Sequence, residues 1–430
     1  MTIGIDFGTS TSEVAYVDKQ GKVVLVPNHL GSFITPSIVY LQPNHKPLVG
    51  LEAKEQVLVD PDNGFIEIKR LLGQDVTLTA QGKTYKPVDI AHMIIRYLVD
   101  CAQTAIGEPV TEAVITVPAY FTDAQRQEVI EAGRMAGLQV KRILNEPTAA
   151  SLDYGLQHMD LCNHVLVYDL GGGTLDVTVL ELFDGVVDVK ASAGNNTLGG
   201  KEFDQALIDH LLSTLTKKER AALTQDPRAA MRLKMAATQC KEALSQNEHF
   251  SIELPFLYTL DDKPKSLHTQ VNRQLFGSLI EESIRSTKEQ IDTVLTDAQL
   301  SPNDIDQILL VGGSTRIPLV RQMLSQLFGK FPVSAVDPDL AVVRGAAIQA
   351  GVLSGVFQED AIVLTDVCPY SLSTAVLRGK NFHGDPLEVC DVLIPRNTTL
   401  PTSISRVYAT AYDNQTAVHI TAYQGESERP

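Results

Sequence analysis

Apolar and polar residues alternate in two similar stretches of the chain, each interrupted by a glycine-containing turn. Residues 2–18 read TIGIDFGTSTSEVAYVD, an order of apolar run, turn and alternating run that predicts a β-hairpin. Residues 164–182, HVLVYDLGGGTLDVTVLEL, repeat that order. The corresponding residues are Asp6, Gly8 and Thr9 in the first copy and Asp169, Gly171 and Thr174 in the second. A separation of 163 residues between Asp6 and Asp169 is too long for a solenoid repeat and indicates a duplicated domain.

Other stretches place apolar residues at helical spacing. Residues 87–107 predict a helix with Asp89 in its first turn and Gly107 at its end. After a buried strand within 112–121, residues 122–138 predict a helix capped by Thr122 or Asp123. Further segments follow in the order helical and charged residues (203–249), a strand, a Gly-Gly turn and a helix (304–329), and a last helix ending at Gly355 (337–355).

The segment after the last helix combines acidic and apolar residues in a position typical of a linker. Its apolar core is Ala361-Ile362-Val363-Leu364, which predicts a segment that docks on the protein. Residues 366–423 alternate without a helical period and are rich in Val, Ile, Thr and Tyr, which predicts a β domain or part of one. The sequence stops within this pattern, so we expect a shortened form.

Composition places the chain among ordinary globular proteins. Its 430 residues exceed one core and predict two to four domains. With 36 basic and 52 acidic residues, the net charge of −16 argues against nucleic acid as a partner. The five cysteines have no metal-ligand spacing and indicate free thiols in a reducing compartment. Because we see no signal peptide and no membrane-spanning apolar run, we expect a cytoplasmic protein without a membrane partner.

The glycine triplet at 171–173 needs a physical reason, since glycine costs backbone entropy. A plain tight turn is one explanation. The similar turn in the first copy favours a second explanation, in which backbone N–H groups of both turns approach a polyanion. The hydroxyls of Thr9, Ser10 and Thr174 would add donors, and Asp6 and Asp169 suit a hydrated Mg²⁺. The stretch GNNTLGGK (194–201) is not a Walker loop, because Gly200 stands where that motif needs lysine.

Six stretches together resemble a known family. In chain order they are GIDFGTSTS, ITVPAYF, RILNEPTAA, VYDLGGGTLDV, LVGGSTRIP and IPRNTTLP. They resemble the seventy-kilodalton heat-shock chaperones of DnaK type, within the actin/hexokinase-like ATPase superfamily, over nearly the whole chain. The resemblance implies an α/β fold: a two-lobed actin-like ATPase (a duplicated ribonuclease-H-like fold), then a linker and a partial β-sandwich.

The resemblance also implies domain limits. The nucleotide-binding ATPase domain would span 1–356, with lobe I at about 1–160 plus the C-terminal helix and lobe II at about 161–336. Residues 357–365 would form the interdomain linker, and 366–430 the N-terminal part of the peptide-binding β domain, without its lid.

Site residues follow from the resemblance by their positions in the matching motifs. The implied catalytic residues are Asp6, Lys69, Glu146, Asp169 and Thr174. The implied Mg²⁺ site, mostly through water, comprises Asp6, Asp169 and Asp176. The implied ATP and ADP contacts are Gly8, Thr9, Ser10, Gly171, Gly172, Gly173, Thr174, Gly199, Gly200, Lys241, Ser245, Gly312, Gly313, Ser314, Arg316 and Asp339. Without the family motif, the sequence would favour a solvated surface amine at Lys69; only the motif assigns it the catalytic role.

Among the residues implied to contact the nucleoside, the sequence departs from the family pattern at two positions in the predicted helical segment 203–249. Glu242 stands where many members have arginine or an apolar residue against adenine, and Thr238 replaces a glutamate that touches the ribose. The resemblance therefore implies an altered nucleotide affinity.

Partner contacts are implied in the same way. Arg142, Asn145, Thr148 and Asp366 match positions that contact J-domain co-chaperones, although ordinary surface polar residues would look the same. Leu377, Tyr408, Ala411, Val418 and Ile420 match the hydrophobic peptide groove.

The resemblance implies an ATP-dependent molecular chaperone that hydrolyses ATP weakly. Hydrolysis between the lobes would be coupled through the linker to binding and release of extended apolar client peptides. The implied partners are clients, a J-domain co-chaperone and a nucleotide exchange factor; K⁺ would be a further cofactor, and the protein a monomer. Two alternatives on the same fold are a small-molecule kinase and a filament-forming ATPase, because fold alone does not fix function.

Overall fold

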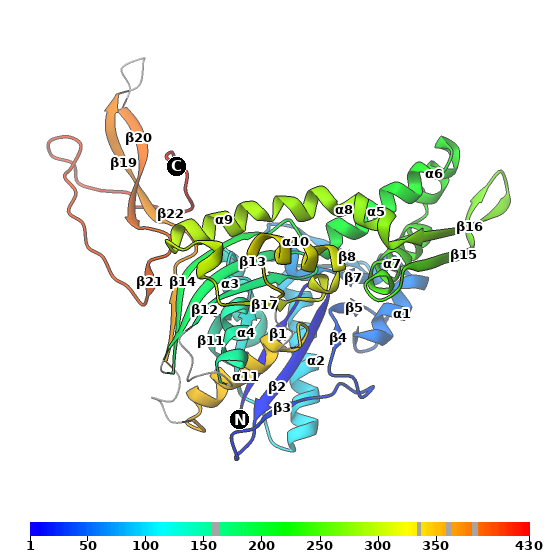
Figure 1. The fold of residues 1–430 in the computed structure, drawn as a ribbon, viewed down its shortest axis with the longest axis horizontal. Helices are drawn as coiled ribbons and strands as arrows, with labels where there is room; N and C mark the ends of the chain where they lie inside the picture. Colours follow the sequence, from blue (N-terminus) through cyan, green and yellow to red (C-terminus); the bar gives the residue numbers. More distant parts are fainter. Residues whose placement is uncertain (157–162, 184, 333–336, 358–362, 381–385) are drawn as a thin grey trace.

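Two six-stranded sheets organise the computed structural model, which describes residues 1–430 except 157–162, 184, 333–336, 358–362 and 381–385 (Figure 1). The first sheet, which we call the lobe I sheet, has the order β11-β10-β1-β2-β3, with β4 paired to β2. Its strands are β1 (Thr2–Phe7), β2 (Thr11–Val17), β3 (Val23–Leu25), β4 (Thr35–Pro36), β10 (Glu112–Val117) and β11 (Gln139–Asn145).

The second sheet, the lobe II sheet, has the order β17-β12-β13-β14-β18-β21. Its strands are β12 (Asn163–Leu170), β13 (Leu175–Phe183), β14 (Val186–Asn195), β17 (Gln307–Val311), β18 (Val363–Val367) and β21 (Thr399–Leu400). Both predicted hairpins form, β1 with β2 and β12 with β13, each antiparallel. The outer neighbours, β10 beside β1 and β17 beside β12, are parallel in both sheets, so the duplication predicted from sequence extends beyond the hairpins.

The predicted helices form where capping residues and apolar spacing agree. Helix α2 (Pro87–Ile106) begins with proline in its first turn, where Lys86 N donates to Asp89 Oδ2 at 2.6 Å, and Gly107 ends it with φ of 76°. Helix α3 (Asp123–Met135) is capped by Thr122, which accepts from Gln125 N. The remaining helices are α1 (Leu51–Val59), α4 (Glu146–Gly155), α5 (Gly200–Ser213), α6 (Lys217–Gln225), α7 (Pro227–Leu244), α8 (Arg273–Ser286), α9 (Lys288–Asp297), α10 (Pro318–Phe328) and α11 (Ala341–Leu353).

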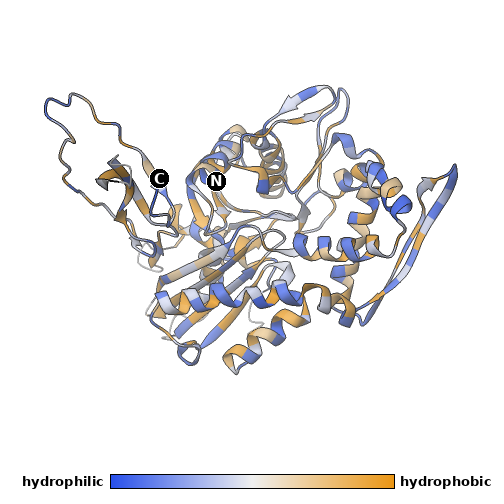
Figure 2. Cartoon of the chain, turned by 90° about the horizontal axis from the view of Figure 1, so that it is seen from above, coloured by the Kyte–Doolittle hydropathy of each residue, from blue (hydrophilic) through white to orange (hydrophobic). Residues whose placement is uncertain are grey.

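Smaller elements complete both lobes. They are the sheet of β5 (Ile38–Tyr40), β6 (Leu48–Val49) and β7 (Gly64–Ile66), the hairpins β8–β9 (Leu78–Ala80, Lys83–Tyr85) and β15–β16 (His249–Leu260, Lys263–Asn272), and the 3-10 turns η1 (Pro61–Asn63), η2 (Ile68–Leu71), η3 (Pro302–Asp304) and η4 (Gly313–Arg316). In Figure 2 the strands inside the body are largely apolar, whereas the helices around them turn polar residues outward. Among the described residues, no helix has the length and apolarity to cross a membrane.

Helices α4 and α11 cross between the two sheets, within a buried cluster that also contains residues of both sheets. Small residues allow the close crossing: a Cβ at Gly345 would lie 1.7 Å from the carbonyl oxygen of Ala149. Where α11 packs on β1, a Cβ at Gly4 would likewise lie 2.2 Å from Ala347 N. The two backbones therefore touch directly, with no side chain between them.

The C-terminal part confirms one prediction and differs from another. Val363 and Leu364 of the predicted docking segment belong to β18, which pairs in parallel with β14, while Ala361 and Ile362 lie outside the described residues. Strands β19 (Leu372–Lys380), β20 (Pro386–Ile394) and β22 (Ala422–Gln424) form a separate sheet. Residues 401–421 form no helix or strand, although their alternation predicted strands. The segment is exposed along most of its length (Figure 1), and no described strand pairs with it.

Candidate functional site

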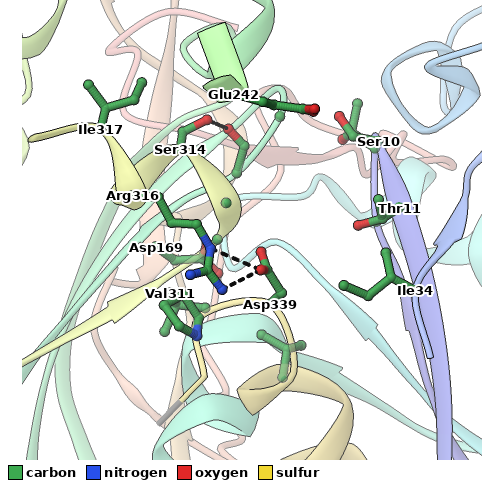
Figure 3. A pocket seen from close by; sticks show the side chains of 18 of the residues that line it. Ser10, Thr11, Ile34, Asp169, Glu242, Val311, Ser314, Arg316, Ile317 and Asp339 are labelled. Carbon is green, nitrogen blue, oxygen red and sulfur yellow. Dashed lines mark hydrogen bonds and ion pairs between the residues drawn. The ribbon is translucent and has the colours of Figure 1, made fainter. Parts of the chain in front are cut away.

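The two hairpin turns face each other across one cavity of about 760 Å³. A Cβ at Gly172 would lie 2.1 Å from Ser10 Oγ, and one at Gly173 would lie 3.2 Å from Thr9 Cγ2. The approach leaves little room for a side chain at Gly172 and Gly173, whereas a Cβ at Gly171 would have its nearest neighbour, Thr174 O, at 3.9 Å. In Figure 3, Ser10 and Thr11 of the first hairpin lie on one side of the cavity and Ser314 and Arg316 on the other.

Most of the predicted catalytic and nucleotide-binding residues line this cavity. They are Asp6, Gly8, Thr9, Ser10, Lys69, Glu146, Asp169, Gly171, Gly172, Thr174, Lys241, Ser245, Gly312, Gly313, Ser314, Arg316 and Asp339. Four others are not part of the lining: Gly173, Asp176, Gly199 and Gly200. Gly199 lies against the second turn, since a Cβ there would lie 2.5 Å from Gly173 N. The structure thus brings together residues that are up to 333 positions apart in the sequence (Asp6 to Asp339).

Helix α5 supports the glycine turn from behind. Gly199 caps this 14-residue helix, Gly200 N donates to Gly171 O at 3.0 Å, and Lys201 N donates to Gly172 O at 2.9 Å. The positive end of the helix dipole therefore lies beside the turn, which favours an anion there.

Lys69 is buried, with 2% of its side chain exposed, and so is not a surface amine. Its Nζ donates to Glu146 Oε1 at 2.5 Å. The ammonium also lies 5.8 Å from the ring centre of Phe7 and 5.5 Å from that of Phe121. Lys69 sits on η2 and Glu146 is the first residue of α4, so two separate elements fix the pair at the cavity. A buried cation held in this way suits the stabilisation of phosphate charge.

Three aspartates surround this ion pair. Burial, together with the charge of Glu146, raises the pKa of Asp6 and of Asp176 to about 7, while Lys69 opposes the rise. Burial likewise raises the pKa of Asp169 well above its usual value. Thr116 Oγ1 donates to Asp6 Oδ1 at 2.7 Å, and Ala119 N donates to Asp176 Oδ2 at 3.3 Å. Four carboxyl groups near one lysine give the site an excess of acid that a cation would neutralise.

The same carboxyl groups fit a metal held through water better than a directly bound one. Asp176 Oδ1 is buried and has no hydrogen-bond partner among the residues that the structure describes, so an acceptor is left open. Within the described ranges, however, no three Asp, Glu, His or Cys side chains converge as direct ligands. Mg²⁺ commonly keeps several of its waters in proteins, which matches this donor set.

On the other side of the cavity, polar contacts hold the η4 turn. Arg316 donates to Asp339 Oδ2 from Nε at 3.0 Å and from Nη2 at 2.6 Å (Figure 3). Ser314 Oγ donates to Gly171 O at 2.9 Å, which ties η4 to the second turn. The guanidinium plane of Arg316 and the apolar side chains of Ile317 and Val342 offer surfaces on which a purine could stack.

The two departures from the family pattern lie on α7 beside the cavity. Glu242 is part of the lining. Thr238 Oγ1 donates to Asp204 Oδ2 at 2.9 Å, and Lys241 Nζ donates to the same oxygen at 3.0 Å. Thr238 therefore supports the lysine through Asp204, which the sequence did not point to because it lies on α5.

Residues of the predicted co-chaperone contact also come together. Asn145 Nδ2 donates to Asp366 Oδ2 at 2.9 Å and Thr148 Oγ1 donates to the same atom at 3.4 Å, while the charge of Arg142 lowers the pKa of this carboxyl against the larger raising effect of burial. Arg126, which sequence reasoning missed, donates to Asn145 Oδ1 at 2.8 Å. Its position four residues after Thr122 in a plain helical pattern gave no signal of this role.

A second missed residue is Glu13, which lies opposite Asp6 in the β1–β2 hairpin and lines the cavity. It is 2% exposed, and in the described part of the chain its Oε1 has no hydrogen-bond partner. A glutamate at a buried position of an alternating strand is the signal that could have found it.

The residues predicted to line a peptide groove are not brought together. Leu377 lies on β19 and is 52% exposed. Tyr408, Ala411, Val418 and Ile420 lie in the exposed segment 401–421, outside any strand.

Comparison with known proteins identifies the family. The family model described as Hsp70 protein matches residues 2–79 and 74–429. The chaperone protein DnaK of Thermotoga neapolitana is 44% identical over 427 residues, which cover 99% of this chain and 70% of that protein. The chain belongs to the Hsp70 family. As an Hsp70 protein it is an ATP-dependent chaperone that hydrolyses ATP, and its two-lobed α/β fold confirms the fold expected from the sequence. The kinase and filament alternatives are not supported.

Proposed function

We propose that this Hsp70 protein hydrolyses ATP between the two hairpin turns and transmits the result to its C-terminal β segment through β18. The observation that carries the proposal is the contact of the two turns beside the buried Lys69–Glu146 pair. In this role the N–H groups and hydroxyls of both turns bind phosphate oxygens. Lys69 orients the attacked phosphate and the water, and Glu146 holds Lys69 in place.

Asp6, Asp169 and Asp176 are the proposed holders of Mg²⁺ through its waters, and Thr174 and the glycines complete the phosphate contacts. The bound ion would neutralise phosphate charge during the transfer. K⁺ remains a further proposed cation at the same acidic end. Ser245, Gly312, Gly313, Ser314, Arg316 and Asp339 are the proposed nucleoside contacts, with Lys241 beside them.

The proposed coupling starts at β18, which adds to the edge of β14 through Val363, Leu364 and Thr365. Asp366, at the end of the added segment, binds Asn145, the residue before Glu146. A change at Asp366 would therefore affect Asn145, which is the N-cap of α4. The first residue of that helix is the proposed catalytic Glu146.

Arg126 connects Asn145 and Asp366 to the residues of the proposed Mg²⁺ site. Besides Asn145, it donates to Ala119 O at 2.8 Å and to Phe121 O at 3.1 Å. Ala119 N binds Asp176, and the ring of Phe121 lies under Lys69. The loop 118–121 thus contacts Arg126, which binds Asn145, and also Asp176 and Lys69. This arrangement supports coupling between the linker and the catalytic residues.

Contacts between the C-terminal segment and the lobes support the same proposal. Arg396 Nη2 and Asn397 Nδ2 donate to the two oxygens of Asp297 on α9, at 2.8 and 2.9 Å. Tyr370 Oη donates to Tyr120 O at 2.8 Å. These contacts would be made in one nucleotide state and released in the other, as in a two-state switch.

The domain limits and partners are proposed with this function. The proposed ATPase domain spans 1–356, the linker 357–365 and the β segment 366–430, which would bind extended apolar clients. The cluster of Arg142, Asn145, Thr148 and Asp366 is the proposed contact of a J-domain co-chaperone. A nucleotide exchange factor, a monomeric state and the cytoplasm complete the proposal; the described cysteines, which are unpaired thiols, fit a reducing compartment.

The deciding experiment measures ATP turnover with and without a J-domain and an extended apolar peptide. We expect weak basal turnover that rises with both additions, and a smaller rise in Asp366→Ala. Asp413→Ala, at an exposed position of the 401–421 segment, is the control. Turnover that ignores both additions in the unchanged protein would refute the coupling, and absence of turnover would refute the site.

A further inference from the structure

The lobes touch at a second place, away from the crossing of α4 and α11. Buried residues of lobe I, Ile38, Tyr40, Ala53 and Val57, form a small apolar cluster from β5 and α1. Met231 and Met235 of α7, a lobe II helix, pack against this cluster and are partly buried. Figure 1 shows α1 beside α7 at one end of the molecule. We call this contact the methionine seam.

Both methionines lie on one face of α7, because residues four apart in a helix are neighbours. Ion pairs between the lobes border the seam. Glu67 Oε1 binds Lys234 Nζ at 2.8 Å and its other oxygen binds Lys201, while Arg70 Nη1 binds Glu202 Oε1 at 2.8 Å. Glu67 has a left-handed backbone, with φ of 60°, which these pairs hold in place.

The border of the seam reaches the cavity. Glu67 and Arg70 flank Lys69 in the sequence, and a Cβ at Gly173 would lie 3.0 Å from Arg70 Cδ. A separation of α1 from α7 would therefore also draw these ion pairs and the two turns apart. Separation of the turns would release what they hold.

We propose that Met231 and Met235 form an oxidation site through which a peroxide accelerates nucleotide release. In the reaction, a sulfur lone pair takes one oxygen atom from hydrogen peroxide, the O–O bond breaks and water leaves. The sulfur is oxidised by two electrons and the peroxide is reduced. The inference rests on the proposed function in that the nucleotide lies between the turns.

The chemistry of the seam explains the expected effect. A thioether packs against aliphatic and aromatic groups, whereas a sulfoxide is polar and needs hydrogen-bond partners. On the lobe I side of the seam Ile38, Ala53 and Val57 have no side-chain donor, and the hydroxyl of Tyr40 already donates to Asp60 Oδ2 at 2.8 Å. Oxidation of both sulfurs therefore favours a hydrated, separated seam.

Three other methionines of the described residues differ in their surroundings, and Met159 lies outside these residues. Met93 packs on the core of lobe I and Met323 on that of lobe II, each within one lobe. Met135 is 37% exposed at the end of α3, away from the seam, and provides a matched control for oxidation without separation of the lobes.

The test compares the unchanged protein, Met231→Leu/Met235→Leu and Met135→Leu. Each is loaded with a fluorescent ADP, oxidised with hydrogen peroxide and then treated with dithiothreitol, so that reversible cysteine oxidation is removed. Peptide mass spectrometry measures sulfoxide at each methionine, and stopped-flow fluorescence measures ADP release. Amide hydrogen exchange of α1 and α7, without nucleotide, reports the seam independently. Leucine keeps the volume and apolar character of methionine.

We expect ADP release to become about tenfold faster on oxidation of the unchanged protein and of Met135→Leu, and to change less than twofold in the double leucine variant. Equal acceleration in all three proteins, or none despite sulfoxide at both positions, would overturn the inference, as would resistance of both sulfurs to peroxide. If ADP does not bind at all, the proposed function fails instead. Hydrogen exchange in α1 and α7 then still decides the inference, which requires an increase on oxidation.

Discussion

Replacement of Lys69 by methionine tests the catalytic core most directly. Methionine keeps an unbranched apolar side chain, and removes the charge that lies over the rings of Phe7 and Phe121 together with its hydrogen bond to Glu146. Two effects should separate: a loss of phosphate stabilisation and a loss of folding stability.

The size of both effects follows from burial. Lys69 is 2% exposed and its partner Glu146 is 12% exposed, so solvent screens the pair very little. The loss of a preorganised group that stabilises the transition state costs about 10²–10³ in rate, or about 2.7–4 kcal/mol. Removal of one partner from a buried ion pair costs about 3–5 kcal/mol of stability, because the other charge stays buried alone.

The assay follows single-turnover ATP hydrolysis, ATP affinity by titration and thermal unfolding on the same preparations. Lys69→Met should hydrolyse ATP about 10²–10³ times more slowly, bind it within a few-fold of the unchanged protein and unfold at a lower temperature. Lys69→Met/Glu146→Gln should regain much of the stability without regaining turnover. Lys83→Met, at an exposed position on β9, is the control for the loss of a lysine.

Equal turnover in Lys69→Met and the unchanged protein would remove Lys69 from the catalytic residues. If the double variant recovered turnover together with stability, the rate loss would reflect partial unfolding, and the electrostatic argument would be refuted.

Three further predictions concern coupling, packing and pH. Hydrogen bonds to a charged group are worth about 1.5–3 kcal/mol, so Asp366→Asn should reduce peptide stimulation of ATP turnover about tenfold, and undiminished stimulation would contradict the coupling. Gly345→Ala would place a Cβ 1.7 Å from Ala149 O and should cost about 3 kcal/mol or more in urea unfolding, whereas Gly277→Ala, with open space around it, should not destabilise. Burial raises the pKa of Asp6 to about 7, so the folded protein retains this proton from about pH 4 to 7 while the unfolded chain loses it. The contribution of Asp6 to nucleotide-free stability should therefore fall as pH rises through that window, and Asp6→Asn should remove this part of the pH dependence.

The strands, helices and twin turns could be predicted because their signals are local. The hairpin patterns, the Thr122 cap and the glycine at 107 each act within a few residues of where they occur. The cavity followed from the repetition of Asp, Gly and Thr in two hairpins, since a duplicated fold places equivalent turns in equivalent positions.

Other features depend on contacts between distant segments and left no local signal. The buried ammonium of Lys69 is paired with Glu146, which lies 77 residues away. Pairing of β18 with β14 joins Val363 to Val186. Residues 401–421 show the reverse case, in which alternation is present but no partner strand lies beside it.

The backbone contact of Gly345 with Ala149 has a mechanical consequence. Because no side chain separates the helices there, this contact would serve as the fixed pivot of any rotation of one lobe against the other. A small rotation about it moves the tips at α1 and α7 much farther than the base. A partner that binds at α1 and α7 would therefore have the largest effect on the release of nucleotide from the cavity between the lobes.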